Sequence, residues 1–370
     1  MRGSEMRPVV VAAGGTGGHF FPAEALAAEL IRRGQRVVLM TDARSGGLAS
    51  PVFEGRERFV LAGSGIAGRG AVRALRSVAA LAAGTWQARG ILARLRPAAI
   101  VGFGGYPCVA PVIASRFLAN RPAVVLHEQN GVLGRANRML CGRADVLALS
   151  FAGTARVPGG VRTEVTGNPV RPAITAQPYT APGTGIRLLV LGGSLGALVF
   201  SDVVPPALAL LPAVLRARLV VTQQCRAEDL ERVREAYAAS GIAATLAPFF
   251  ADVAALLTGA HLVIARAGAS TVAELAVVGR PAILVPLPTA IDDHQSANAA
   301  TLGDGAWVMP QSVFTPAALA ERLAALIADP DALARAAAAA ASAGRPDAAA
   351  RLADLVEHAM NRTAVQESRA

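Results

Sequence analysis

Two glycine-rich turns, one in each half of the chain, are the segments best suited to chemistry. GGTGGH at residues 14–19 follows the apolar run 9–13, and GGSLG at residues 192–196 follows the apolar run 188–191. A strand, a glycine turn and a helix start expose unpaired backbone N–H groups, which attract phosphate. The repetition predicts two nucleotide-fold domains with a diphosphate site in the cleft that they form.

His19 ends the first turn, at the predicted start of a helix. A histidine there can accept a proton or donate a hydrogen bond to a diphosphate, although a helix cap is the alternative. HEQNG at residues 127–131 follows another apolar strand. Four consecutive polar side chains at a strand end need hydrogen-bond partners, which favours a ligand site over a purely structural cluster.

Two further glycine segments lie in the first half. GFGGYP at residues 102–107 includes Gly104, Gly105 and Tyr106, and IAGRG at residues 66–70 includes Gly68 and Arg69. Either segment could be a simple turn, because glycine relieves steric strain there. If both lie at one sheet edge with Gly14, Gly15 and their neighbours, three amide-lined loops surround one anionic group.

The second half offers a further phosphate site. RAGASTVAE at residues 266–274 follows the strand 262–265, and Glu274 could accept two ribose hydroxyls. The alternative is an acidic residue that merely stabilises the first turn of a helix. Asp329-Pro330-Asp331 imitates a metal-binding DxD but lies between two alanine-rich segments, so we expect a helix cap. The five histidines are scattered, and no metal site is predicted.

Composition narrows the class of protein. The 370 residues have a net charge of +10 without a single lysine, which excludes Schiff-base chemistry and a phosphate-binding loop of the ATPase type. No apolar stretch is long enough to cross a bilayer, and the start lacks the apolar segment of a signal peptide. The three cysteines are far apart, as expected of reduced core thiols in a cytoplasmic protein.

Positive charge is concentrated in the first half. Between Phe59 and Ala144 the single carboxylate is Glu128, against eleven arginines, which indicates an anionic partner surface. Aromatic residues make up 4% of the chain, so anionic lipid is favoured over nucleic acid. Apolar and basic residues alternate in one segment, as on a helix at a membrane interface, unless the apolar ones enter the core. This predicted membrane-facing set is Ile66, Val72, Arg73, Leu75 and Arg76.

Short apolar runs alternate with longer amphipathic ones, which predicts an α/β fold with doubly wound parallel sheets. We expect a first domain at 1–167, a Pro-, Thr- and Gly-rich linker at 168–186 and a second domain at 187–345. A last helix around 346–360 would return to the first domain, and residues 362–370 would be frayed. Strands are predicted at 9–13, 36–40, 99–102, 123–127, 146–149, 188–191, 218–221, 244–246, 262–265 and 282–285. Helices are predicted at 22–33, 71–95, 107–119, 135–141, 197–211, 227–239, 251–257, 271–278, 294–302 and 316–327.

These motifs, in this order, resemble the bacterial MurG family of glycosyltransferase family 28. The family's members are UDP-N-acetylglucosamine:N-acetylmuramyl-(pentapeptide) pyrophosphoryl-undecaprenol N-acetylglucosamine transferases, which make lipid II for peptidoglycan. The matching strings are GGTGGHFFPA, GFGGY, HEQNGVLGRAN, TGNPVRP, LGGSLGA, RAGASTVAEL and DDHQSANA, which span nearly the whole chain. The resemblance implies the GT-B architecture, two Rossmann-like domains that face a deep cleft.

The resemblance also implies roles for individual residues. The donor UDP-GlcNAc would bind mainly to the second domain, and Phe250 would offer backbone atoms to uracil although an aliphatic residue is frequent there. Glu274 would hold the ribose hydroxyls, and Gln295 would face the sugar. The implied donor-binding set is Thr16, Gly17, Gly18, Asn130, Arg171, Ser194, Phe250, Ala269, Ser270, Thr271, Val272, Ala273, Glu274 and Gln295.

The implied reaction is an inverting transfer to the acceptor's 4-hydroxyl without metal or cofactor. His19 is the first choice of general base and Glu128 is the rival. The implied partners are lipid I on undecaprenyl pyrophosphate, an anionic membrane surface, and cell-wall and division proteins, but not nucleic acid. The enzyme would be peripheral, on the cytoplasmic face of the inner membrane, and would contribute to cell shape and the cell cycle.

Three alternatives remain open at this point. A GT-B transferase could act on diacylglycerol or an aglycone instead. A UDP-GlcNAc 2-epimerase has a similar fold but would release its product without any acceptor. A non-catalytic module could bind the nucleotide sugar alone, although His19, Glu128 and Glu274 disfavour it.

Overall fold

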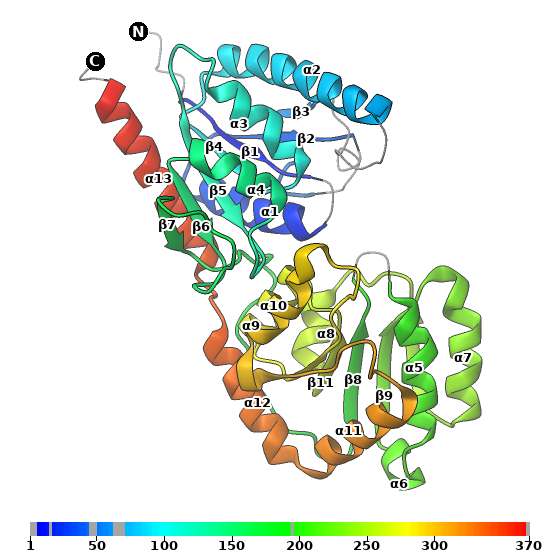
Figure 1. Ribbon diagram of the computed structural model, residues 1–370. Helices are drawn as coiled ribbons and strands as arrows, with labels where there is room; N and C mark the ends of the chain where they lie inside the picture. The colour runs from blue at the N-terminus through cyan, green and yellow to red at the C-terminus, as the bar shows by residue number, and fades with distance from the viewer. Residues whose placement is uncertain (1–5, 15–16, 44–49, 62–70, 194–195, 368–370) are drawn as a thin grey trace. The chain divides into compact units, whose positions relative to one another are not determined.

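The computed structural model describes residues 6–14, 17–43, 50–61, 71–193 and 196–367. The chain divides into two compact units (Figure 1). Unit 1 comprises Met1–Pro172 and Asp347–Ala370, and unit 2 comprises Ala173–Pro346. Both divisions lie in the stretches predicted as the linker and as the start of the returning helix.

Unit 1 is built on a parallel sheet that has seven strands within the described residues. Central strands carry apolar side chains on both faces, because helices cover both, and such strands read as uninterrupted apolar runs. In sheet order the strands are β3 (Arg58–Val60), β2 (Val37–Thr41), β1 (Val9–Ala12), β4 (Ala99–Gly102), β5 (Ala123–Glu128), β6 (Val146–Leu149) and β7 (Thr163–Val165).

Alternating residues of β1 separate the two cores of unit 1. Val9 and Val11 face the core beneath α1 (Gly17–Arg32) and α13 (Ala348–Glu367). Val10 and Ala12 face the other core, to which α2 (Ala71–Leu95), α3 (Val109–Ser115) and α4 (Arg135–Leu140) contribute. Two short 3₁₀ helices, η1 (Tyr106–Cys108) and η2 (Cys141–Arg143), precede α3 and follow α4.

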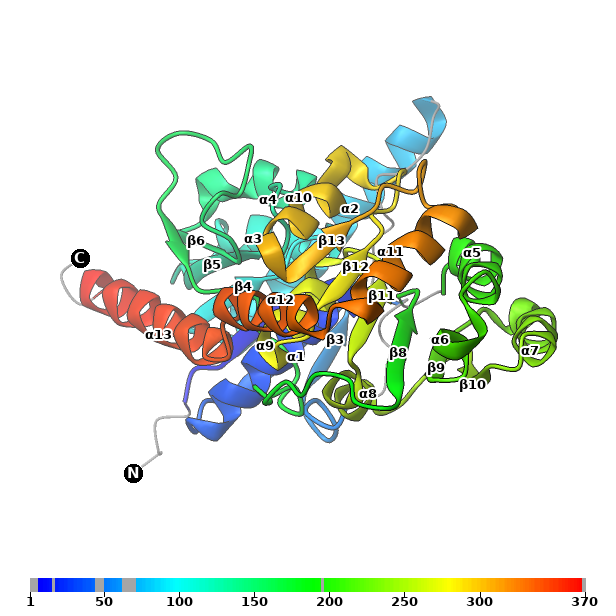
Figure 2. The ribbon, with the colours of Figure 1, turned by 90° about the horizontal axis from the view of Figure 1, so that it is seen from below.

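Unit 2 repeats the plan with a parallel sheet that has six strands in the described part. Its first strand along the chain, β8 (Ile186–Leu191), carries Ile186, Leu188 and Val190 into a core with α5 (Leu198–Ala209) and α11 (Pro316–Ala328). Figure 2 labels these three elements. In sheet order the strands are β10 (Ala243–Ala247), β9 (Leu219–Gln224), β8 (Ile186–Leu191), β11 (Leu262–Ala265), β12 (Ala282–Leu284) and β13 (Ala306–Val308). The other helices are α6 (Ala213–Arg216), α7 (Leu230–Ala239), α8 (Val253–Gly259), α9 (Ala269–Val278), α10 (His294–Ala300), α12 (Pro330–Ala343), η3 (Ala227–Asp229), η4 (Ile291–Asp293) and η5 (Gly303–Gly305).

The predicted doubly wound fold is confirmed, with corrections at the ends of elements. The prediction of a frayed end is wrong as far as Glu367, because α13 extends to that residue. Asp329 accepts a hydrogen bond of 2.9 Å from the Ala332 backbone N–H and caps α12, as expected. The three cysteines are free and buried, also as expected, and burial raises the pKa of Cys108 to about 12.

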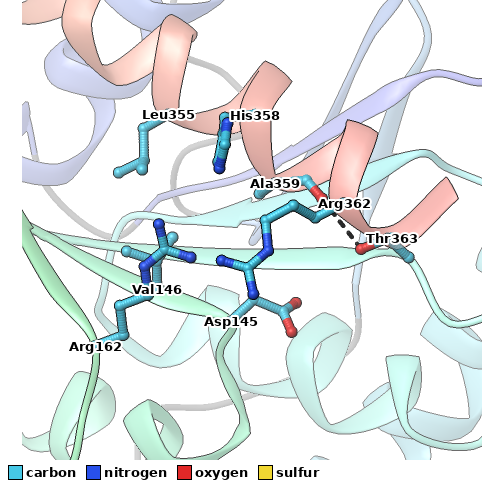
Figure 3. A pocket seen from close by; sticks show the side chains of 8 residues that line it. All are labelled: Asp145, Val146, Arg162, Leu355, His358, Ala359, Arg362 and Thr363. Carbon is cyan, nitrogen blue, oxygen red and sulfur yellow. Dashed lines mark hydrogen bonds between the residues drawn. The ribbon is translucent and has the colours of Figure 1, made fainter. Parts of the chain in front are cut away.

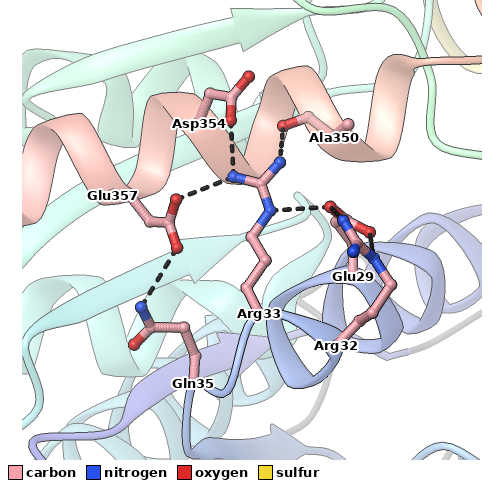
Figure 4. A network of polar contacts seen from close by, with 7 residues as sticks. All are labelled: Glu29, Arg32, Arg33, Gln35, Ala350, Asp354 and Glu357. Carbon is pink, nitrogen blue, oxygen red and sulfur yellow. Dashed lines mark hydrogen bonds and ion pairs between the residues drawn. The ribbon is translucent and has the colours of Figure 1, made fainter.

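The returning helix α13 is fixed to α1 by a charged network (Figure 4). The Arg33 guanidinium bonds to Glu29 at 2.8 Å, Asp354 at 2.6 Å and Glu357 at 2.8 Å. It also donates to the Ala350 carbonyl oxygen at 3.0 Å. Hydrogen bonds from Arg32 and Arg33 lower the pKa of Glu29 from 4.5 to about 2. The residue directly after the first helix thereby holds a segment more than 300 positions later in the chain.

We expect Arg33→Met to lower the free energy of unfolding of unit 1 by about 2 kcal/mol, because several charge-assisted bonds are lost. Arg32→Met is the matched control, since Arg32 bonds to Glu29 but does not reach α13. Its effect should be smaller, because Arg32 and Glu29 form an exposed pair that solvent screens. Urea unfolding with hydrogen exchange of the α13 amides measures both; equal losses would contradict the assignment.

The same variant has a defined pH dependence. Folding lowers the pKa of Glu29, so this carboxylate stabilises the protein above its unfolded value of 4.5. The contribution disappears as the pH falls through the folded value of about 2. Arg32, the larger cause of the shift, is kept in Arg33→Met, so the difference in unfolding free energy between wild type and this variant should shrink between these two values only by the part that Arg33 contributes.

Candidate functional site

Three predicted site segments of unit 1 follow neighbouring strands. The turn at Gly14 follows β1, the loop with Gly104 and Gly105 follows β4, and His127 and Glu128 end β5. β4 pairs in parallel with both β1 and β5, so the carboxyl ends of all three meet at one sheet edge. The predicted convergence of the loop at Gly14 and the loop at Gly104 and Gly105 on one sheet edge is therefore present in unit 1.

His19 lies in the first turn of α1, directly above the β4 loop. A Cβ atom built on Gly104 would be 3.5 Å from His19 Cδ2, and one on Gly105 would be 3.7 Å from His19 Cε1. Both glycines have positive φ, +76° and +65°. The positive φ favours glycine at both positions, and the imidazole lies at van der Waals distance from each of them.

Glu128 is buried at the end of β5, with both carboxylate oxygens engaged. Oε1 accepts from the backbone N–H and the side-chain amide of Asn130, each at 3.0 Å. Oε2 accepts from the Gly134 N–H at 2.9 Å and from Asn137 Nδ2 at 2.8 Å. Glu128 thus positions the loop that carries Asn130.

His127 is also buried, and burial lowers its pKa to about 4. Nδ1 lies 2.9 Å from Gln129 Nε2, and Nε2 lies 3.0 Å from the Gly167 carbonyl oxygen. These partners fit a neutral ring that accepts at Nδ1 and donates at Nε2. The ring therefore links the end of β5 to the segment that precedes Asn168.

The sequence analysis did not identify two residues of this edge, Asp42 and Asn137. The Tyr106 hydroxyl donates to the carboxylate of Asp42, a buried residue just after β2. Asn137 donates to the His127 carbonyl oxygen at 3.0 Å as well as to Glu128. Its Nδ2 would also lie 3.3 Å from a Cβ on Gly104. The available signals were the string TD at the end of β2 and the polar Asn137 in the string GRAN at the start of α4.

Several predicted residues of unit 1 can be placed only partly. Gly17 and Gly18 open α1, and the Arg171 guanidinium lies 5.1 Å from the centre of the Phe21 ring. Val72, Arg73, Leu75 and Arg76 belong to α2, but their side chains are not described. Gly15, Thr16, Ile66, Gly68, Arg69 and Ser194 lie outside the described residues.

The N-terminus of α9 is the clearest predicted donor element of unit 2. Gly268 precedes the helix, and Ala269, Ser270 and Thr271 form its first turn. The Ser270 hydroxyl is buried and finds no hydrogen-bond partner among the described residues. Glu274 is the sixth residue of α9 and is 7% exposed, so it lies beyond the first turn.

The second glycine turn belongs to unit 2, as do the remaining residues predicted to bind UDP-GlcNAc. Gln224, which the sequence analysis missed, accepts from the Gly192 N–H at 3.1 Å and donates to the Gly193 oxygen at 2.8 Å. Gln295 accepts from the Leu287 N–H at 2.9 Å. Phe250 lies between β10 and α8, while Val272 and Ala273 are buried in α9.

Comparisons with known proteins agree with this architecture. The models of the N-terminal and C-terminal domains of glycosyltransferase family 28 match residues 9–148 and 187–352. A Granulibacter bethesdensis protein is 64% identical, with 97% of this chain and 96% of that protein covered. One from Acidiphilium cryptum is 57% identical, with 96% and 98% covered. Both are named UDP-N-acetylglucosamine--N-acetylmuramyl-(pentapeptide) pyrophosphoryl-undecaprenol N-acetylglucosamine transferase.

A solved structure indicates the same family as the two relatives. The crystal structure of Acinetobacter baumannii MurG is 30% identical, with a TM-score of 0.77 over 95% of this chain and 99% of that one. The two parallel-sheet units and their glycine turns define a glycosyltransferase of the GT-B class. The chain belongs to the MurG group of N-acetylglucosamine transferases in glycosyltransferase family 28.

The contact between His19 and the β4 loop predicts a specific defect in Gly104→Ala. The added methyl group at φ +76° would strain the backbone by about 1–3 kcal/mol, lie only 3.3 Å from Asn137 Nδ2, and contact His19 at 3.5 Å, so relief of the strain would shift the β4 loop against His19. Gly55→Ala is the control, because Gly55 has φ +68° with nothing within 4 Å of a Cβ. Both variants should lose similar stability, but only Gly104→Ala should lose about tenfold or more in kcat. Equal activity in the two variants would contradict the contact.

Proposed function

We propose that the protein transfers GlcNAc from UDP-GlcNAc to the 4-hydroxyl of the MurNAc of undecaprenyl-pyrophosphoryl-MurNAc-pentapeptide, with inversion. The product is lipid II of peptidoglycan synthesis. The observation that carries the proposal is 64% identity over nearly the full length of a relative with this named activity. Acceptor-free epimerisation and transfer to other lipids are disfavoured by the same likeness.

In this proposal unit 2 holds the donor. The first-turn N–H groups of α9 bind phosphate, and the unpartnered Ser270 hydroxyl supplies a further donor. Glu274 accepts the ribose hydroxyls and Gln295 faces the sugar. Phe250 offers its backbone to uracil, a contact that does not depend on the type of side chain.

Unit 1 provides the base and the acceptor loops in this proposal. His19 is half-buried at the carboxyl edge, where an imidazole can accept the proton of the attacking hydroxyl. The rival Glu128 accepts four N–H groups, which favours a positioning role for that carboxylate. Gly14, Gly15, Gly68, Arg69, Gly104, Gly105 and Tyr106 form the proposed acceptor diphosphate loops.

Charge develops on UDP as the sugar leaves. Arg171, together with N–H groups near Ser194 and in the first turn of α9, would stabilise it without a metal ion. Donors of this kind contribute about 3 kcal/mol each to the transition state in comparable sites. No separate cofactor is needed for such a displacement.

A transfer assay tests the activity itself. With UDP-GlcNAc and a lipid-linked MurNAc-pentapeptide acceptor in excess EDTA, the wild type should form the disaccharide product. With the donor alone, no N-acetylmannosamine or UDP-N-acetylmannosamine should appear. Loss of turnover in EDTA with recovery on added manganese would contradict metal-free transfer, and an epimer from the donor alone would contradict transferase specificity.

Two variants in the same assay separate the proposed roles. His19→Ala should lower kcat by about 100- to 10,000-fold, the usual contribution of a general base, while UDP binding persists. Glu274→Ala should mainly raise KM for the donor, because it removes two hydrogen bonds to the ribose. Near-wild-type kcat in His19→Ala, or an unchanged KM in Glu274→Ala, would reject the respective role.

We further propose that unit 1 binds the cytoplasmic face of an anionic membrane, where proteins of cell-wall synthesis and division would meet it. No helix in the described residues is long and apolar enough to span a bilayer. Three large apolar side chains on α2 and the segment after α3 are exposed, Val78 (63%), Trp86 (74%) and Phe117 (61%). Arg89 lies 5.5 Å from the Trp86 ring centre and donates to the Phe117 oxygen at 3.2 Å. Apolar and basic groups together suit an interface with anionic lipid.

Vesicle sedimentation tests this surface. The double variant Trp86→Ser, Phe117→Ser should bind vesicles of anionic phospholipid at least about tenfold more weakly, because insertion of each ring contributes roughly 1.5–3 kcal/mol. The control Val214→Ser removes a 76% exposed apolar residue of unit 2 and should bind normally. Wild-type binding that is absent, or equal in both variants, would refute the membrane surface.

A further inference from the structure

A small pocket lies on unit 1 between α13 and the amino ends of β6 and β7 (Figure 3). It encloses about 100 Å³. The glycine loops follow the carboxyl ends of the parallel strands, so the pocket is at the opposite edge of the sheet. None of its residues belongs to the transfer site described above.

Two arginines from separate elements enter this pocket. Arg162 directly precedes β7, and Arg362 lies in the last part of α13. Figure 3 shows both side chains directed into the same space. Within the described residues, no carboxylate lies within 4 Å of either guanidinium. His358, one turn before Arg362, adds an imidazole to the same wall.

The one carboxylate that lines the pocket is neutralised elsewhere. Asp145 accepts a 2.7 Å hydrogen bond from the Val124 N–H and lies 3.2 Å from the Arg121 guanidinium. Its charge is therefore balanced by Arg121. Arg162 and Arg362 are exposed, and they leave the pocket with two positive charges that an anion would balance.

The residues behind the pocket are buried, so its wall is anchored in the core. Leu355 is 4% exposed and Ala359 is 7% exposed, and both anchor α13 in the core beneath the sheet. The Thr363 hydroxyl donates to the Ala359 oxygen at 3.1 Å, so one helix turn is fixed behind Arg362. Guanidinium groups present paired N–H donors that match the oxygens of a phosphate group.

We propose that Arg162, Arg362 and His358 form a second anion site, which binds a phosphate group. The ligand is either free phosphate or the phosphate monoester of a lipid headgroup, since both present the same oxygens. The site does not depend on the transfer reaction, because its residues are remote from the glycine loops in the sheet. A bound phosphate would join α13 to β7 through opposite charge.

Calorimetric titration with inorganic phosphate, in the presence of saturating UDP to fill the donor site, tests the proposal. The double variant Arg162→Gln, Arg362→Gln should bind phosphate at least about tenfold more weakly, because two charge-assisted contacts are lost. Arg322→Gln on α11 is the matched control, an exposed arginine of unit 2 with the same change in charge, and should bind like wild type. The imidazole NMR signals of His358, assigned with His358→Gln, should shift with phosphate in the wild type and in Arg322→Gln but not in the double variant.

A second arm distinguishes the two sources of phosphate. Vesicles of phosphatidylcholine with phosphatidic acid are compared with vesicles of phosphatidylcholine alone. If free phosphate binds and the double variant weakens this binding, the ligand is soluble. If free phosphate does not bind, but phosphatidic acid vesicles do and the double variant weakens this binding, the ligand is a lipid headgroup. If neither ligand binds, or if the Arg322→Gln control weakens binding as much as the double variant, the proposal is overturned.

Discussion

The parallel pairing of β1, β4 and β5 is the constraint on which the unit 1 site depends. Because β4 pairs with both neighbours in parallel, the segments that follow the three strands must emerge at one edge. The chain has no lysine, so backbone N–H groups and arginine must recognise anions there. Parallel pairing therefore converts three short glycine-containing segments, which are weak signals individually, into one surface around His19.

Beneath that surface, a buried polar network replaces the apolar packing found elsewhere in the core. His127, Glu128 and Asn137 are each 2% exposed or less, a costly arrangement without partners. The cost is offset because Glu128 and His127 have partners at all their ring or carboxylate atoms, and Asn137 bonds to both residues. Only the Asn137 side-chain oxygen lacks a partner among the described residues, and the other bonds of the network fix the geometry of the loop with Asn130.

The sequence predicted the centre of each sheet better than its edges. β4, β6 and β11 begin and end where their apolar runs predict, because these strands are buried on both faces. The edge strands β3 and β7 have three residues each and are partly exposed, so no apolar pattern marked them. The bond between Asp42 and Tyr106 joins positions 64 apart, and no local spacing encodes such a contact.

Arginine side chains also anchor the segments of the chain that lie next to the two divisions between the units. On the unit 2 side of the first division, Arg280 stacks on Tyr179 and donates to the carbonyl oxygens of Gln177 and Pro178. Burial lowers its pKa, and carbonyl dipoles provide the compensation that a carboxylate would otherwise give.

On the unit 1 side of the second division, Arg351 donates to the Val165 oxygen at 2.9 Å, and Arg33 holds the helix at Ala350. A guanidinium has five N–H donors in a planar fork, so one side chain can bind several carbonyl oxygens where an ammonium would act as a single point charge. The segments that enter each unit are thus anchored by side chain to main chain bonds, which do not require a matching acidic residue. The chain has 36 arginines and 26 acidic residues, so arginines outnumber the carboxylates that could pair with them. Some arginines can therefore bind carbonyl oxygens, and others can bind anionic ligands.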